Sequence, residues 1–373
     1  MTSQDSRPLV VVLFGGRSSE HSVSCVTAAG VLGAIDTDKY RVLPVGITRG
    51  GTWRLVEDWQ SFRFDPENMP EVVEAGPEVL PPVAAGRAPL RMRSADGEVS
   101  ELGPADVCFP LLHGPYGEDG TIQGFFELSD TPYVGSGVFA SAASMDKHFM
   151  KIVLRAAGLA VCPWTLITRR DWGTQREDAL ERIGELGFPV FLKPARAGSS
   201  VGVSKVADAS GLDRAFALAF EHDSKVLVEP AVTGREIECG VLGSLHNEPA
   251  RASVPGEIIV TGDHDFYDFE AKYLDDDAVV LSCPADLPDE VVARVQDASV
   301  RAFEAMECTG LARVDTFVTA AGEVIINEIN TLPGFTPSSM FPRMWQASGV
   351  DYPALVETLI TTALADFASA HGE

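Results

Sequence analysis

Acidic and amide side chains gather on one short stretch near the carboxyl end of the chain, RVDTFVTAAGEVIINEINTLPG, residues 313–334. β-Branched residues on both sides of Ala320-Ala321-Gly322 predict a β-hairpin. If the turn is centred on the last two of these residues, Asp315 lies opposite Glu328, with Arg313 two residues along on the same face. A bulge in the turn would shift this register.

The pleat of the second strand decides which of its side chains act together. Ile326, Glu328 and Asn330 should share one face, while Asn327 should point to the other. Two carboxylates, those of Asp315 and Glu328, and an amide oxygen on a dry hairpin are costly to bury unless a cation neutralises them. Oxygen ligands with positions left for phosphate suit Mg²⁺ rather than Zn²⁺. A cross-strand ion pair on a solvated face is the alternative interpretation.

Lysines beside glycine-rich loops indicate a second kind of chemistry. Lys193 ends a strand predicted over residues 188–193, and the loop after it, PARAGSSVGVSKV, contains Ser199 and Ser200. Such a loop can bring backbone N–H groups close to an oxyanion, although an ordinary Gly/Ser turn has the same composition. Other isolated cations are Lys147, Lys272 and Arg313. Because phosphoryl transfer needs mainly positioning and neutralisation of charge, these cations and the hairpin oxygens favour a nucleoside triphosphate as ligand.

Four more carboxylates and a histidine lie where predicted strands end or helices begin. Glu20 follows a Gly-Gly turn, and His113 and Glu118 lie in a glycine-rich turn after a buried strand, where open α/β sheets place ligands. Glu229 and Glu236 lie at the end and start of two successive strands and could take ribose hydroxyls. The alternatives are a charge that complements a helix dipole at Glu20 and plain turns elsewhere.

Residues 256–280, GEIIVTGDHDFYDFEAKYLDDDAVV, mix acids and aromatic residues with a single Lys272-Tyr273 pair. The segment has no clean periodicity. It is typical of a long ordered loop that covers an active site.

Composition and charge exclude several classes of protein. The 373 residues carry a net charge of -25, which argues against nucleic acid as a partner because phosphate contacts need a basic surface. The six cysteines form no CxxC pair, so they indicate reduced core residues in a cytosolic protein rather than a zinc site or a disulfide framework. The apolar run VVVLF near the N-terminus is too short to span a membrane, so neither secretion nor membrane anchoring is expected.

The elements that must position these residues predict a mixed α/β protein. An apolar strand over residues 9–14, a helix and a strand over 40–48 form a βαβ unit, but neither a GxGxxG fingerprint nor a Gly-Lys pair is present. Residues 50–104 are Pro-rich and predict a surface elaboration with a small hairpin or two. A helix from about 136 onwards, holding residues 145–148, leads into the next unit. We divide the chain into domains at 1–137, 138–230 and 231–373.

Seven motifs in this order resemble those of the D-alanine-D-alanine ligase family of the ATP-grasp superfamily over nearly the whole chain. That family implies an N-terminal Rossmann-like (pre-ATP-grasp) domain that binds substrate and two α+β domains that clamp ATP. Residues 50–104 resemble the insertion of its longer members. The motifs are GGRSSEHSVS (15–24), LHGPYGEDGTIQG (112–124), MDKHFMK (145–151), KPARAGSSVGVSKV (193–206), FYDFEAKY (266–273), RVDTF (313–317) and NEINTLPGFTPSSMFP (327–342).

The resemblance implies a role for each matching residue. Contacts to ATP phosphates are expected from Lys147, Lys193, Ser199, Ser200 and Lys272, and contacts to adenosine from Glu229 and Glu236. Two Mg²⁺ ions, with Mn²⁺ as an alternative, are expected on Asp315, Glu328 and Asn330. Catalytic or substrate roles are implied for Glu20, His113, Ser199, Lys272, Tyr273, Arg313, Gly334, Ser338 and Ser339.

The implied reaction joins two D-alanines through a D-alanyl phosphate, for peptidoglycan precursor synthesis and cell-wall biogenesis. Tyr273 resembles the dipeptide-forming members and favours D-alanine as the second substrate. D-lactate, D-serine or another amine acceptor remains the alternative, as does a nucleotide-binding regulator without turnover. The family implies a cytoplasmic homodimer.

Overall fold

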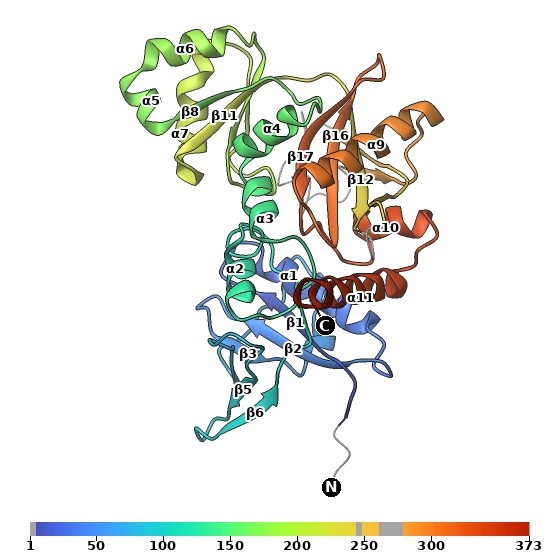
Figure 1. Cartoon of the computed structure of the whole chain (residues 1–373). Helices are drawn as coiled ribbons and strands as arrows, with labels where there is room; N and C mark the ends of the chain where they lie inside the picture. Colours follow the sequence, from blue (N-terminus) through green and yellow to red (C-terminus); the bar gives the residue numbers. More distant parts are fainter. Residues whose placement is uncertain (1–4, 244–247, 261–278, 373) are drawn as a thin grey trace.

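A computed structural model describes residues 5–243, 248–260 and 279–372 (Figure 1). The predicted covering loop lies largely outside these residues, and with it Lys272 and Tyr273. The ends of that segment were predicted wrongly as loop, because β14 (Gly256–Val260) and β15 (Val279–Ser282) pair as antiparallel strands. No helix of the described residues is both long enough and apolar enough to cross a membrane.

The first sheet begins with the expected βαβ unit. β1 (Leu9–Gly15), α1 (His21–Ala34) and β2 (Arg41–Ile47) precede β7 (Val107–Pro110), and both neighbouring strands run parallel to β1. Every residue of β1 is buried, because side chains on both of its faces pack against apolar layers. α2 (Thr121–Leu128) contributes Phe126 to one of these layers, and α1 lies on the other.

Residues 50–104 extend this sheet. β3 (Trp53–Leu55), β4 (Glu78–Leu80), β5 (Leu90–Arg93) and β6 (Val99–Gly103) add antiparallel strands in the order β6-β5-β4-β3-β2-β1-β7. A short 3-10 turn, η1 (Trp59–Ser61), lies between the first two of them. The expected small hairpins therefore belong to the main sheet of the first unit.

A four-stranded sheet in the order β10-β9-β11-β8 follows. Its strands are β8 (Thr165–Thr168), β9 (Val190–Pro194), β10 (Ser204–Val206) and β11 (Lys225–Pro230). Helices α5 (Arg169–Thr174), α6 (Arg176–Gly184) and α7 (Leu212–His222), with the 3-10 turn η2 (Ala209–Gly211), pack around it. An apolar layer that includes Phe216 and Leu192 fills the space between α7 and the sheet, which leaves Lys193 on the opposite face.

The third sheet carries the hairpin. Its order is β15-β14-β12-β16-β17, with β13 (Arg251–Ala252) paired to β12 (Arg235–Leu242). β16 (Leu311–Val318) and β17 (Val324–Asn330) are the two hairpin strands. Helix α9 (Asp289–Ala305) packs on one face, while α10 (Met340–Ala347) contacts β12 near Gly240. The remaining part of that second face is free to line a site.

The helix predicted from about residue 136 is two helices. α3 (Val138–Met145) ends before Asp146, and α4 (Lys147–Ala156) begins after it. The Asp146 carboxylate accepts hydrogen bonds from the backbone N–H groups of His148 and Phe149, so it caps α4 and breaks the helical run. Met150 and Leu154 of α4 pack with Ile326 and Ile329 of β17.

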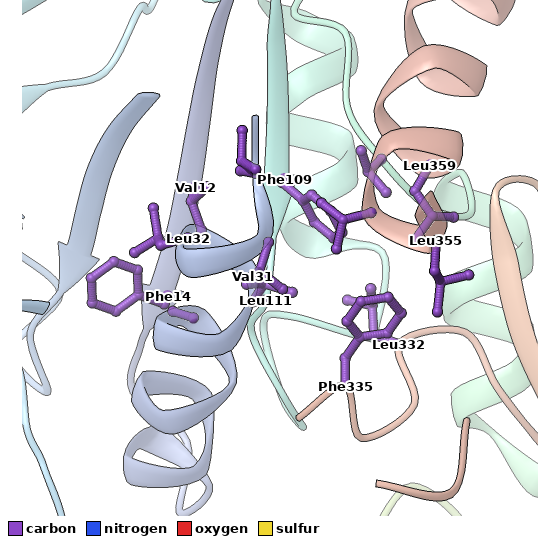
Figure 2. Close-up of a cluster of buried hydrophobic side chains, with 14 of the residues drawn as sticks. Val12, Phe14, Val31, Leu32, Phe109, Leu111, Leu332, Phe335, Leu355 and Leu359 are labelled. Atoms are coloured by element: carbon purple, nitrogen blue, oxygen red, sulfur yellow. The ribbon is translucent and has the colours of Figure 1, made fainter. Parts of the chain in front are cut away.

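The last helix, α11 (Tyr352–His371), returns to the first sheet. Leu355 and Leu359 lie in one buried cluster with Phe109 of β7 and with Phe335 from the loop after the hairpin (Figure 2). The Phe109 and Phe335 rings meet edge to face at 6.2 Å. Each of the three predicted domain segments contains one sheet, and this cluster fastens the third segment to the first.

Candidate active site

The hairpin register places the acidic pair as predicted. Asp315 lies opposite Glu328 and Arg313 lies opposite Asn330. The predicted faces are wrong at two positions, because the register shifts between Asp315 and Thr316 and leaves Asn327 as an extra residue of β17. Ile326 and Ile329 consequently share the buried core, and both Asn327 and Glu328 line the cavity.

Two adjoining cavities lie beside this hairpin. One cavity, of about 510 Å³, lies between the second and third sheets. Its lining includes Lys193 of β9, Glu236 of β12 and Glu328 of β17. The other, of about 590 Å³, extends toward the first sheet and reaches Glu20 and His113. They share lining residues, namely Lys147, Ala197, Ser199, Glu238, Ile258, Arg313 and Glu328, so the two form one continuous chamber with one end beside Lys193 and the other beside Glu20.

The cations of the chamber are each held by oxygen partners. Lys193 Nζ lies 2.8 Å from Glu229 Oε2 and donates to Asn327 Oδ1 at 3.1 Å. Burial would lower the pKa of Lys193, but Glu229 beside it raises that pKa instead. Lys147 Nζ lies 3.3 Å from Glu328 Oε2 and donates to the Ala197 carbonyl at 3.0 Å. Both ammonium groups are thereby aimed at the same cavity.

Arg313 is fixed by two carboxylates on neighbouring strands. Its Nε and Nη2 donate to the two oxygens of Asp315 at 2.7 Å, and Nε lies 3.1 Å from Glu238 Oε1. Burial alone would lower the pKa of Arg313, yet Asp315 and Glu238 keep it well above its ordinary value. The guanidinium is therefore a permanent, well-oriented cation in the part of the chamber that both cavities share.

The hairpin oxygens fit a hard divalent cation. Asp315 and Glu328 face one another across the ladder, and Asn330 Nδ2 donates to Asp315 Oδ2 at 2.9 Å. The described residues contain no group of three or more His, Cys, Asp or Glu side chains able to hold a metal ion. Mg²⁺ is usually bound by one or two carboxylates together with phosphate oxygens of the substrate, not by protein ligands alone. The two carboxylates and the amide oxygen of the hairpin fit this mode of binding.

The Gly/Ser loop after β9 reaches across to the first unit. Ser199 Oγ donates to Glu20 Oε1 at 2.7 Å, which joins two residues far apart in sequence. Ser199 and Ser200 adopt left-handed backbone angles, with φ of 50° and 56°. Such angles are costly for serine, and residues with such backbone strain cluster at active sites and ligand-binding loops. The anion-binding role of this loop stays a prediction.

His113 and Glu118 lie in the turn after β7, near Glu20. His113 is buried, and burial lowers its pKa although Glu20 opposes that effect. Burial raises the pKa of Glu118 to about 8, and the charge of Glu20 adds to this rise. The Gly114 N–H donates to the Glu118 carboxyl group and partly opposes it. This end of the chamber thus places the Glu20 side chain near a carboxyl group, that of Glu118, whose raised pKa favours the protonated form at neutral pH.

The segment after the hairpin lines the end of the chamber near Glu20. Gly334, Ser338 and Ser339 all line it, and Ser339 lies at the N-terminus of α10. Thr336 donates to Ser339 Oγ through its backbone N–H at 3.2 Å, which fixes the serine at this helix end. Exposed N–H groups at a helix N-terminus favour a carboxylate.

The structure brings together all of the expected site residues that it describes. It also shows residues that the sequence reasoning did not assign to the site: Asn327 and Glu238, which line the chamber, and Lys151, which lies behind it. Asn327 was placed on the wrong face because the bulge is invisible in the residue types. Lys151 carries a signal, since it lies one helical turn after Lys147 and therefore on the same side of α4.

Two α+β units that face one another over a cavity with paired lysines on one side and a carboxylate hairpin on the other define an ATP-grasp enzyme. Two family models cover most of the chain: one described as D-ala D-ala ligase N-terminus matches residues 9–136, and one described as D-ala D-ala ligase C-terminus matches residues 153–361. The chain belongs to the D-alanine-D-alanine ligase family.

Individual relatives agree with this assignment. The chain is 57% identical to the D-alanine--D-alanine ligase of Arthrobacter sp. (strain FB24), over 96% of this chain and 94% of that protein. It is 57% identical to the ligase of the same name from Kineococcus radiotolerans, over 97% and 98%. Among solved structures, the D-alanine-D-alanine ligase from Coxiella burnetii matches with a TM-score of 0.80 and 34% identity, covering 98% of this chain and 96% of that one. The VanG D-Ala:D-Ser ligase from Enterococcus faecalis matches with a TM-score of 0.79 and 34% identity, covering 96% and 99%.

Proposed function

We propose that the chain joins two D-alanines at the expense of ATP, forming D-alanyl-D-alanine for peptidoglycan precursor synthesis in the cytoplasm. The observation that carries the proposal is the single chamber that Lys193, Glu328 and Glu20 all line from three different units. One end accepts a nucleotide and the other accepts small amphoteric molecules, which is what a carboxylate–amine ligase requires.

The residues divide the work by charge. Lys147 and Lys193 hold the ATP phosphates, the Ser199–Ser200 loop adds backbone N–H groups, and Glu236 takes the adenosine part. Glu229, the other residue expected on adenosine, has its carboxylate engaged by lysines. We therefore expect the adenosine to contact the backbone of Glu229 and of the residues that follow it, which line the cavity.

Asp315, Glu328 and Asn330 would hold the Mg²⁺ ions, with Mn²⁺ as an alternative, and the ions would neutralise charge on the transferred phosphoryl group. Glu20, held by Ser199, anchors the ammonium group of the first D-alanine. The carboxylate of that D-alanine attacks the γ-phosphorus, which breaks the bond to ADP and gives an acyl phosphate.

The amine of a second D-alanine then attacks the acyl carbon. Arg313 and the Gly334 N–H donate to the oxyanion of the tetrahedral intermediate, which collapses with loss of phosphate and a proton. His113 lies beside the first substrate, and Ser338 and Ser339 receive the carboxylate of the second. Lys272 and Tyr273, outside the described residues, belong to the segment that we expect to close over the acyl phosphate and exclude water.

Phosphate release tests the proposal. Purified protein with MgATP should release phosphate when D-alanine is added and not when L-alanine is added, with D-alanyl-D-alanine detected by mass spectrometry. Because a D-Ala:D-Ser ligase matches the fold as well as the D-alanine enzyme does, D-serine and D-lactate belong in the same assay. Phosphate release that depends on D-serine or D-lactate and not on D-alanine would mean that the acceptor is that compound. No phosphate release with any of them would favour a nucleotide-binding regulator.

The oligomeric state is a separate part of the proposal. Apolar side chains are exposed on the adjoining helices α2 and α3, among them Leu128 at 80% and Phe139 at 50%. Such a patch favours association, and we expect a homodimer. Sedimentation velocity should then give twice the mass of the 39.9 kDa chain; a monomer at all concentrations would contradict it.

A further inference from the structure

Three charged side chains form a buried row beside the nucleotide end of the chamber. Lys151 Nζ of α4 lies 2.8 Å from Glu229 Oε1, and Lys193 Nζ of β9 lies 2.8 Å from Glu229 Oε2. The side chains of Lys151 and Glu229 are 1% and 3% exposed, whereas that of Lys193 is 15% exposed and lines the cavity. The row therefore presents Lys193 to a ligand and keeps Lys151 behind it.

Local structure fixes the order of this row. Leu227 of β11 pairs with Lys193 of β9, and Glu229 pairs with Phe191, so Lys193 and Glu229 project from the same face as diagonal neighbours. Lys147 and Lys151 lie one turn apart on α4, so the helix directs both toward the same region. Lys147 reaches Glu328 at the cavity while Lys151 reaches Glu229 beneath it.

The charges of the row do not cancel. Burial would raise the pKa of Glu229, but Lys193 and Lys151 lower it to about 2, so this carboxyl group is ionised at neutral pH. Lys193 and Glu229 alone would form a neutral pair, and a phosphate approaching Lys193 would then meet almost no net charge. With Lys151 included, the row carries one net positive charge.

Packing alone does not explain Lys151. A buried lysine loses its hydration, and an apolar residue of similar volume usually serves stability equally well. Among the described residues, neither Lys151 Nζ nor Glu229 Oε1 has a hydrogen bond of ordinary geometry, although the two atoms are 2.8 Å apart. What the geometry shows between Lys151 and Glu229 is a close ion pair, through which Lys151 adds a positive charge to the row.

We propose that Lys151 is a positioning residue that balances Glu229, so that Glu229 can orient Lys193 without cancelling the charge that Lys193 offers to the nucleotide phosphates. The proposal rests on the proposed function in taking a nucleoside triphosphate as the ligand. It assigns Lys151 no contact with substrate.

Charge-changing variants separate this role from a packing role. Lys151→Met leaves the row neutral, and a unit charge about 10 Å from a phosphate at an effective dielectric of about 20 corresponds to a loss in affinity on the order of 10-fold. The double variant K151M/E229Q restores one net positive charge while its amide oxygen still accepts from Lys193. We expect K151M to bind MgADP and Mg-AMPPNP about 10-fold more weakly by calorimetry, and K151M/E229Q to return close to the wild-type affinity.

Two further variants complete the design. Lys151→Arg keeps the charge and should bind nucleotide like the wild type. Lys39→Met removes an exposed lysine that pairs with Glu357 far from the chamber, and it should change nothing. Thermal unfolding is recorded for every variant, and Lys151→Gln replaces K151M as the neutral variant if the methionine protein does not fold.

The outcomes distinguish the alternatives. Wild-type affinity in a folded neutral variant, or a double variant as weak as K151M, would overturn the proposal. In steady-state turnover with D-alanine, K151M should raise the KM for ATP far more than it lowers kcat. If the wild type binds MgADP but releases no phosphate with any acceptor, the proposed function fails, while the calorimetric comparison still decides the role of Lys151.

Discussion

Glu118 provides a pH-dependent test of the geometry around Glu20. Its carboxyl group lies in the turn after β7, near the carboxylates of Glu20 and Glu328 and the guanidinium of Arg313. Burial, with the charge of Glu20 added to it, raises the pKa of Glu118 from 4.5 to about 8. The folded protein consequently keeps a proton there at pH values at which the unfolded chain has lost it.

The sign and size of the effect follow from this difference. Because the folded state binds the extra proton, the contribution of Glu118 to stability is fully present below pH 4.5 and is lost as the pH rises toward 8. The expected slope is about 1.4 kcal/mol per pH unit within that window, and the total approaches about 5 kcal/mol above it. Glu118→Gln cannot ionise, so its stability relative to the wild type should rise with pH by these amounts.

Urea unfolding of the metal-free and nucleotide-free protein at pH 5, 6, 7 and 8 measures the difference between wild type and E118Q. Glu304→Gln, on an exposed position of α9, is the matched control and should show no comparable change with pH. Glu20→Gln should narrow the pH window and reduce the total difference, since it removes the second cause of the raised pKa. A constant difference between wild type and E118Q across this range would refute a protonated Glu118 in the folded protein.

Three further predictions concern catalysis and the core. Glu328→Gln should leave the fold intact and reduce kcat at least ~100-fold by weakening neutralisation of the phosphoryl group; near-normal turnover in the phosphate-release assay would remove Glu328 from the metal site. Ser199→Ala removes the 2.7 Å hydrogen bond to Glu20 and should raise the KM for the first D-alanine about 10-fold, with the KM for ATP changed less; the reverse pattern would place Ser199 with the nucleotide. Phe335→Ala empties a site in the cluster that joins α11, β7 and the post-hairpin loop and should cost about 3–5 kcal/mol in urea unfolding; a loss below ~1 kcal/mol would mean that the cluster collapses around the gap.

The hairpin shows how far residue types alone can specify a site. The predicted pairing of Asp315 with Glu328 is confirmed, although the pairs nearer the turn lie one residue from the predicted register, since Thr316 pairs with Ile326. The bulge at Asn327 restores the predicted pairing further along the strands. The strict alternation of β17 failed, because Asn327 is an extra residue and Ile326 and Ile329 both enter the core. The position of a bulge depends on the elements that pack on each face of the sheet, which here are α4 and α9 on the apolar face. The sequence of the strand alone does not identify these packing partners.

Long-range contacts account for the other differences. The break at Asp146 separates α3 from α4, although the surrounding residues are compatible with one continuous helix. Asp146 also forms an ion pair with Lys225 of β11, a contact between segments that local periodicity cannot reveal. In the same way, α11 has a periodic pattern that predicts a helix but not the sheet on which it packs.

The charge arrangement explains how a protein with a net charge of -25 can bind an anionic nucleotide. Lys147 is paired with Glu328, Arg313 with Asp315 and Glu238, and Lys193 with Glu229. Each cation is thus stabilised without ligand, because an unpaired buried charge would be expensive. A nucleotide that arrives with divalent cations offers phosphate to Lys147 and positive charge to Glu328 at once, so both members of that pair exchange partners together. Neither free ATP nor the metal alone can satisfy both, which is why we expect the two to bind cooperatively.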